Sequence, residues 1–171
     1  MPLPEIVRWA IAVLLTAVLA VAAVTDVRER KIPNWTVLAT LALFLPWAVL
    51  HLHPVSWGLW ALGAGVIAFA ATFALYSTGL VGAGDSKLFA AVALFAGMGQ
   101  LIQLTLATTI VGGLIALIGL VMAPTRALVM LKMRGQGDFG RGVPYGVAIA
   151  LGAALVIWAG LFHLVSFPAT A

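Results

Sequence analysis

Residues 79–89, GLVGAGDSKLF, form a polar, glycine-rich stretch between two apolar runs at 57–80 and 88–99. Asp85 and Lys87 stand out in it, because 64% of the chain is hydrophobic and only 8% is charged. Soluble domains carry roughly 25% charged residues, and the mean hydropathy here is +1.17. The composition therefore predicts an integral membrane protein, and its 171 residues are expected to form a single domain, 1–171.

Long apolar segments divide the rest of the chain. A spanning helix needs about 20 apolar residues. Six apolar segments are candidate spanning helices, some of them shorter than this length: 6–24, 35–50, 57–80, 88–99, 101–123 and 143–165. The fourth has only 12 residues, and Gly97-Met98-Gly99-Gln100 is predicted to be the hairpin that joins it to the fifth. We therefore expect an all-α, polytopic membrane protein with six transmembrane helices.

The basic residues give this arrangement an orientation. Lys and Arg concentrate in the cytoplasmic connections of membrane proteins. With the N-terminus outside, the segments 25–34, 81–87 and 124–142 are cytoplasmic and hold eight of the nine Lys and Arg residues. A five-helix alternative scatters these charges over both faces. We therefore expect both termini outside, and an uncleaved first helix, because the basic cluster at 28–31 follows its apolar core.

Metal, redox and nucleic-acid functions find little support. The chain has no cysteine, which excludes disulfides and thiolate ligands. His51, His53 and His163 fall on the outer side in this topology, and the first two are flanked by tryptophans, a pattern typical of a membrane boundary. The net charge of +4 is attributed to membrane orientation and to contact with membrane lipid. No metal, no other cofactor and no nucleic-acid partner is expected.

Two of the five acidic residues occupy unusual places. Asp26 and Asp85 each lie where an apolar run meets the predicted cytoplasmic face, at matched depth. Ionisable groups at membrane-spanning segments are costly and often functional. For each residue alone a structural role stays open: Asp85 with Ser86 would cap the helix that follows, and Asp26 would pair with a nearby arginine. The presence of both residues at matched depth favours a catalytic role over a structural one.

Paired carboxylates have a defined use in hydrolysis. Two that lie close together share one proton, since both cannot ionise cheaply. The ionised carboxylate activates a water molecule, while the protonated one polarises the carbonyl of an amide, as in aspartic proteases. Asp26 and Asp85 are therefore the candidate catalytic pair, at the cytoplasmic face.

Glycines flank the second carboxylate. The stretch around Gly82 and Gly84 fails the phosphate-loop pattern GxxxxGK[ST] and the dinucleotide pattern GxGxxG. We expect these glycines to allow positive φ and a close backbone approach, so that an extended substrate strand lies beside Asp85. The alternative is that they only pack helices.

Three motifs together resemble those of a known family. Gly82-Ala83-Gly84-Asp85 resembles the GxGD signature of intramembrane aspartyl proteases, and GxGDxKL at 82–88 resembles its form in type IV prepilin peptidases. Asp26 followed by Ile32-Pro33-Asn34 is similar to that family's D-x5-IPN segment. Val143-Pro144-Tyr145-Gly146 resembles its [IVL]-P-[FY]-G motif at the start of the last helix.

The resemblance implies an activity and a substrate. It implies six spans, Asp26 and Asp85 as catalytic residues, no cofactor, and cleavage of prepilin-like, single-helix membrane precursors after a short basic leader. The short, cysteine-free chain looks most like the peptidase-only form of tight-adherence (Flp) pili or its archaeal preflagellin counterpart, so methyl transfer is not expected. The implied location is the inner (cytoplasmic) membrane.

The resemblance also brings further residues to the site. Lys87 either supports Asp85 electrostatically or serves only as a topology charge. Pro33 and Asn34 are expected to start the second helix, with Asn34 as its cap. Pro144 is expected in the first turn of the last helix, with Tyr145 and Gly146 beside the site. The segment 124–142 is expected to contain an interfacial amphipathic helix.

Two other functions remain as alternatives. Intramembrane aspartates also mark proton relays in small transporters, and a non-catalytic assembly subunit of a secretion machine is the third interpretation. A relay requires carboxylates near the middle of the membrane. Both carboxylates here are predicted at the cytoplasmic edge, which favours a protease. The sequence leaves the oligomeric state open.

Overall fold

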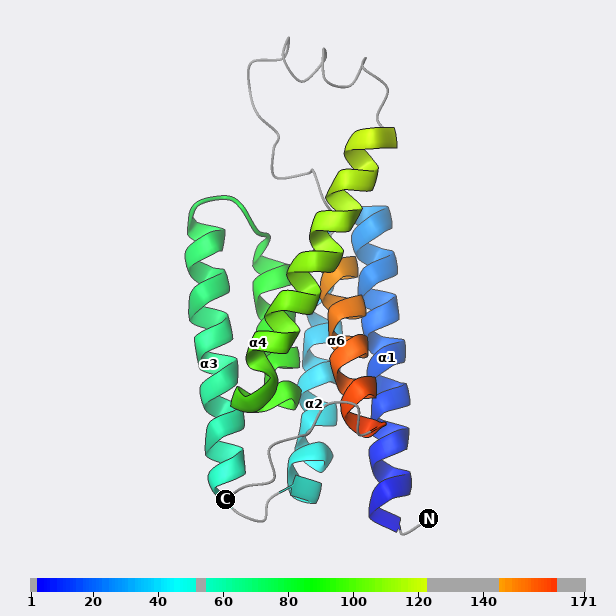
Figure 1. The fold of residues 1–171 in the computed structure, drawn as a ribbon, viewed down its shortest axis with the longest axis vertical. Helices are drawn as coiled ribbons and strands as arrows, with labels where there is room; N and C mark the ends of the chain where they lie inside the picture. Colours follow the sequence, from blue (N-terminus) through cyan, green and yellow to red (C-terminus); the bar gives the residue numbers. More distant parts are fainter. Residues whose placement is uncertain (1–2, 52–54, 123–144, 163–171) are drawn as a thin grey trace.

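The computed structural model describes residues 3–51, 55–122 and 145–162, and nearly all of them are helical. The helices are α1 (Leu3–Glu29), α2 (Asn34–His51), α3 (Val55–Ser77), α4 (Ala83–Met122) and α6 (Tyr145–Leu161). They pack side by side in one bundle along a common long axis (Figure 1). The prediction of an all-α fold is therefore confirmed for the part of the chain that the structure describes.

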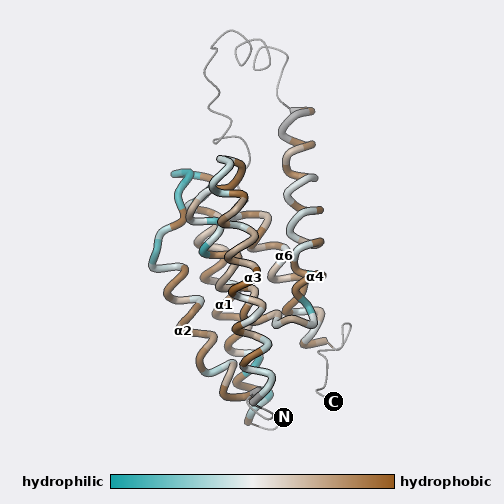
Figure 2. The backbone as a smooth tube through the Cα atoms, turned by 90° about the vertical axis from the view of Figure 1, so that its left-hand side faces the viewer, coloured by the Kyte–Doolittle hydropathy of each residue, from teal (hydrophilic) through white to brown (hydrophobic). Residues whose placement is uncertain are grey.

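By length and composition alone, three of these helices are sufficient to cross a membrane, although α4 is interrupted at Gly97. They comprise Leu3–Glu29, Ser56–Ser77 and Ala83–Ile118, while Asn34–Leu50 and Tyr145–Leu161 are apolar but shorter. Hydrophobic residues follow the helices along most of their length, and a hydrophilic stretch marks the passage from α1 to α2 (Figure 2). These features support a membrane protein, whereas the count of six spans stays a prediction.

The fourth helix reverses direction at one glycine. Gly97 has φ 61° and ψ −178°, which interrupts the helical conformation within α4. A positive φ is accessible to glycine at little cost. The chain turns back at this bend (Figure 1), and we call residues 83–96 the first arm and residues 98–122 the second arm. The predicted joint is confirmed, but Met98 and Gly99 are already helical, so the reversal needs one residue and not a four-residue hairpin.

The helices extend beyond the apolar runs at the site end of the bundle. α1 continues through Thr25 and Asp26 to Glu29, and Arg30 then takes a positive φ of 55°. α4 begins at Ala83, five residues before the expected start at Leu88. The ends of α1 and α3 and the starts of α2, α4 and α6 all gather at this end (Figure 1). We call it the carboxylate end, because Asp26 and Asp85 lie there.

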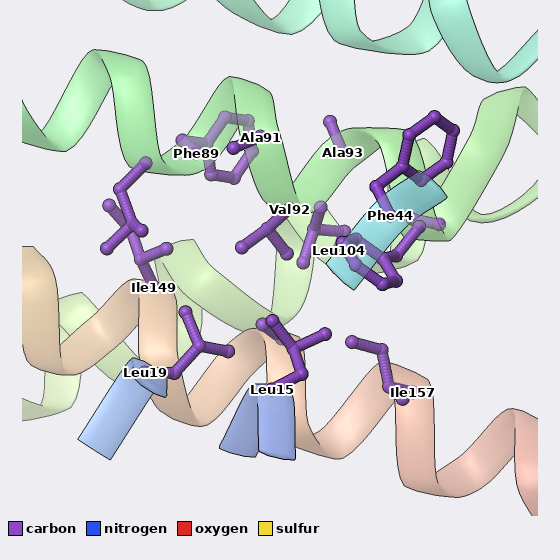
Figure 3. Close-up of a cluster of buried hydrophobic side chains, with 14 of the residues drawn as sticks. Leu15, Leu19, Phe44, Phe89, Ala91, Val92, Ala93, Leu104, Ile149 and Ile157 are labelled. Atoms are coloured by element: carbon purple, nitrogen blue, oxygen red, sulfur yellow. The ribbon is translucent and has the colours of Figure 1, made fainter. Parts of the chain in front are cut away.

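The core of the bundle contains side chains from several helices. Side chains from α1, α2, both arms of α4 and α6 meet in it (Figure 3). They include Leu15, Leu19, Phe44, Val92, Leu104, Ile149 and Ile157. Small residues let the second arm approach α6 closely: a Cβ at Gly152 would lie 2.8 Å from the backbone nitrogen of Thr108. Such contacts hold apolar helices together where lipid offers no hydrophobic driving force.

Candidate active site

Asp26 lies in the last turn of α1 and is only 7% exposed. Its Oδ2 accepts a hydrogen bond of 2.8 Å from the backbone N–H of Gly146, the second residue of α6. The first N–H groups of a helix have no partner within the helix, and its dipole favours an anion there. Asp26 therefore lies near the C-terminal end of α1, where the dipole disfavours an anion, but also at the N-terminal end of α6, where the dipole favours one.

Gly146 makes this hydrogen bond possible. A Cβ at this position would lie 2.9 Å from both Cβ and Oδ2 of Asp26. Real Cβ atoms essentially never approach so closely, so a larger residue would push α6 away from the carboxylate. Gly146 is buried and lies against Asp26.

Asp85 is the third residue of α4 and lies inside its first turn. Its Oδ2 accepts a hydrogen bond of 3.2 Å from the N–H of Gly82, and the carbonyl of Gly82 accepts one of 3.1 Å from the N–H of Ser86. This is the reach-back arm of a capping box, in which the side chain at the third position satisfies the N–H of the capping residue. The interpretation of Asp85-Ser86 as the cap of a helix at Leu88 is therefore wrong, because Gly82 occupies the capping position.

The other oxygen of Asp85 is available for chemistry. Its Oδ1 is buried and has no hydrogen-bond partner among the described residues. Asp85 also lines a cavity of about 540 Å³. A buried carboxylate oxygen without a partner is costly in a native protein and calls for a water, an ion or a ligand.

The glycines of the motif act through close packing. Positive φ among the described glycines occurs at Gly79 and Gly97, so the expectation of positive φ at Gly82 and Gly84 is wrong. Both belong to the start of a helix, where φ is negative. The expected close approach is present, because a Cβ at Gly84 would lie 3.0 Å from Cβ of Ile32. The GxGD and IPN motifs are thus in direct contact.

The two carboxylates come from different helices and meet at the same end of the bundle. The charge of Asp26 acts on Asp85, and the charge of Arg30 acts on Asp26. Tyr145 lies near both carboxylates. It lines the same cavity as Asp85, and the next residue, Gly146, donates the hydrogen bond to Asp26. Asp85 therefore lies on the cavity wall, and Asp26 is held next to Tyr145, another residue of that wall.

The cavity lies between α3, both arms of α4 and the start of α6. Among the described residues of its lining, Asp85 is the one with a charge, and the others are apolar or carry hydroxyl groups. The residues from α3 and from the second arm are Ile67, Ala68, Ala71, Thr72, Leu75, Leu101, Thr105, Thr108, Thr109, Gly112, Gly113 and Ala116. The sequence gives no signal for this wall, because these residues look like any others in an apolar helix.

The remaining predicted site residues are placed differently. Lys87 is exposed and lines a separate groove that does not include Asp85. Asn34 is the first residue of α2 and not its cap; the carbonyl of Pro33 instead accepts hydrogen bonds from the N–H (3.1 Å) and the hydroxyl (2.7 Å) of Thr36. Tyr145 is 38% exposed. Pro144 lies outside the described residues.

Two other expectations also concern residues that the structure leaves undescribed. The segment 124–142, with its expected interfacial helix, and His53 and His163 lie outside the described residues. Within the described ranges, no three His, Asp or Glu side chains gather into a set of metal ligands.

Comparison with protein families gives a match. Residues 13–117 match the model of the type IV leader peptidase family. The matched span includes Asp26, Asp85 and the contact between Ile32 and Gly84, and it ends before α6. No curated protein and no solved structure matches the chain.

Proposed function

Because the chain belongs to the type IV leader peptidase family, we propose that it is a membrane aspartyl endopeptidase with Asp26 and Asp85 as its catalytic pair. Its substrates are prepilin-like precursors, each with a short basic leader before an apolar helix. The observation that carries the proposal is that two carboxylates, from α1 and α4, lie near each other at one end of the bundle, with Asp85 on the wall of a cavity. Family membership supports the reaction class, and the geometry supports the choice of these two residues.

The chemistry follows from one shared proton. The ionised carboxylate takes a proton from water, whose oxygen attacks the carbonyl carbon of the scissile amide. The protonated carboxyl donates a hydrogen bond to the carbonyl oxygen, where negative charge develops. Collapse of the tetrahedral intermediate breaks the C–N bond, and a proton passes from the pair to the leaving amine. Water is consumed, and the pair regains its single proton.

The two helix starts hold the carboxylates for this chemistry. The N–H of Gly146 fixes Oδ2 of Asp26, and the N–H of Gly82 fixes Oδ2 of Asp85. In each case a backbone donor, which has no freedom to rotate, orients the carboxylate. Oδ1 of Asp85 is left to face water or substrate.

The cavity beside Asp85 is where we place the substrate segment at the scissile bond. Its volume, about 540 Å³, lies within the usual range for binding pockets. An apolar lining suits the apolar part of a prepilin-like precursor. The amide groups of an intact helix are already hydrogen-bonded, so the substrate must be extended beside Asp85 for cleavage.

The cellular arrangement completes the proposal. The chain forms one domain of six transmembrane helices in the inner membrane, with both termini outside and the carboxylate end at the cytoplasmic face. The basic residues at 28–31 support this orientation. The enzyme acts as a peptidase without methyltransferase activity, as in the short form found with Flp-type pili.

The test is a cleavage assay in membranes with a prepilin-like precursor. Asp26→Asn and Asp85→Asn each remove a carboxylate at nearly constant volume. Each is expected to lower the cleavage rate by about 100-fold or more, the scale of acid–base catalysis. Size-exclusion chromatography and circular dichroism establish that each variant is folded.

Glu29→Gln is the matched control. Glu29 is an exposed acid in the last turn of α1, three residues after Asp26. This variant is expected to cleave at the wild-type rate. A folded Asp26→Asn or Asp85→Asn enzyme with near wild-type activity would disprove the aspartyl mechanism.

A further inference from the structure

A second groove lies on another face of the bundle, between α2, α3 and the first arm of α4. Its volume is about 470 Å³. The wall consists of Val37, Leu41, Leu62, Gly65, Val66, Phe69, Lys87, Ala90, Ala91 and Leu94. Lys87 is the one polar side chain among these residues. A single cation therefore stands in an otherwise apolar groove.

The groove runs along the first arm from the carboxylate end into the bundle. Lys87 and Leu94 are seven residues apart, which corresponds to about 10 Å of helix. Gly65 fixes the inner end, because a Cβ there would lie 2.5 Å from Cδ2 of Leu94. α3 and the first arm therefore touch at Gly65. The charged residue stands at the outer end, among the starts and ends of the helices.

Lys87 stands exposed at the outer end of the groove, where an anion can reach it. Its side chain is exposed, and none of the described carboxylates pairs with it. A lysine on an apolar helix lays its methylene chain along the apolar surface and extends its ammonium group to the headgroup level. Three more exposed basic residues, Arg28, Arg30 and Lys31, lie in or directly after the last turn of α1, at the same end. Such a cluster attracts anionic lipids.

We propose that this groove binds an anionic phospholipid, with an acyl chain against Val66, Ala90 and Leu94 and the headgroup phosphate on Lys87. Charge complementarity selects the occupant, because a zwitterionic headgroup brings a cation towards Lys87 and an anionic one does not. The site is separate from the catalytic cavity, since Asp85 does not line the groove. Lys87, although only two positions after Asp85 in the chain, would thus bind the lipid phosphate and not the substrate.

The test measures lipid retention by native mass spectrometry. The purified protein in detergent is mixed with equal amounts of dioleoyl phosphatidylglycerol and dioleoyl phosphatidylcholine. The wild type is expected to retain phosphatidylglycerol preferentially. Lys87→Met keeps the length and removes the charge, and is expected to lower this preference about fivefold, the value of one basic residue at the membrane surface. Lys87→Arg is expected to retain it.

Control variants distinguish binding in the groove from general effects of surface charge and of added bulk. Lys31→Met removes an exposed charge at the same end but outside the groove, and is expected to lower the preference less than Lys87→Met does. Ala90→Phe fills the groove and is expected to abolish retention of both lipids, whereas Ala20→Phe, on an exposed position of α1, is not. Size-exclusion chromatography verifies folding. Equal retention of the two lipids by the wild type, or an unchanged preference in Lys87→Met, would overturn the proposal.

Discussion

The backbone N–H of Gly146, at the start of α6, donates a 2.8 Å hydrogen bond to Oδ2 of Asp26, in the last turn of α1. The two residues are 120 positions apart in the chain. Through this bond the end of one apolar helix and the start of another together hold a buried carboxylate. It also explains why a glycine follows Tyr145.

Gly146→Ala is predicted to impair cleavage. The added Cβ would lie 2.9 Å from Oδ2 of Asp26, so either α6 or the carboxylate must move. Overpacking of this kind costs about 1–3 kcal/mol, and we expect the cleavage rate to fall at least ~10-fold. The measurement is the initial rate on a prepilin-like precursor, with precursor well below KM.

Gly63→Ala is the control for this substitution. Gly63 lies in α3, and a Cβ there would meet nothing within 4 Å. The variant is expected to cleave normally, because alanine is also the better helix former. Equal activity of the Gly146→Ala and Gly63→Ala enzymes would show that the contact with Asp26 has no part in catalysis.

Gly97→Ala is predicted to destabilise the protein through the backbone alone. A Cβ at Gly97 would meet nothing within 4 Å, so no clash is involved. The conformation, φ 61° and ψ −178°, belongs to a region that is nearly restricted to glycine. The expected loss is about 1–3 kcal/mol of unfolding free energy. It would appear as a lower thermal midpoint in detergent.

Gly113→Ala serves as the matched variant, since it also has no neighbour within 4 Å but lies in regular helix. Its thermal midpoint is expected to equal or exceed that of the wild type. If both variants melt at the same temperature, the reversal of α4 does not depend on the left-handed conformation at Gly97.

Ala71→Phe is predicted to weaken substrate binding without touching the carboxylates. Ala71 is exposed on α3 and lines the cavity that Asp85 also lines. A phenyl ring there occupies space that the substrate segment needs, so KM is expected to rise about 10-fold while kcat changes little. Steady-state kinetics over a range of precursor concentrations separates the two constants.

Ala70→Phe offers a close comparison, because Ala70 is the preceding residue on the same helix, is also exposed, and does not line the cavity. Its KM is expected to match that of the wild type. A rise in KM of similar size in both variants would place the substrate elsewhere.

Some features of this protein follow from the sequence by itself. Composition alone predicts apolar helices, and the scarcity of acids draws attention to Asp26 and Asp85. The sequence predicts a joint between two segments at residues 97–100, and the structure narrows it to Gly97. These predictions rest on chemistry that each residue carries in any fold: the cost of a charge among apolar residues and the backbone freedom of glycine.

Only the tertiary structure decided which surfaces meet. It placed Asp26 on the start of α6, Gly84 against Ile32, and Lys87 in a groove away from Asp85. In a soluble protein, the polar and apolar faces of a helix indicate its inner side. Here lipid-facing and core-facing residues are equally apolar, so the pattern carries no such signal. Close contacts between small residues determine instead which helices pack together, and such contacts depend on the arrangement of the whole bundle.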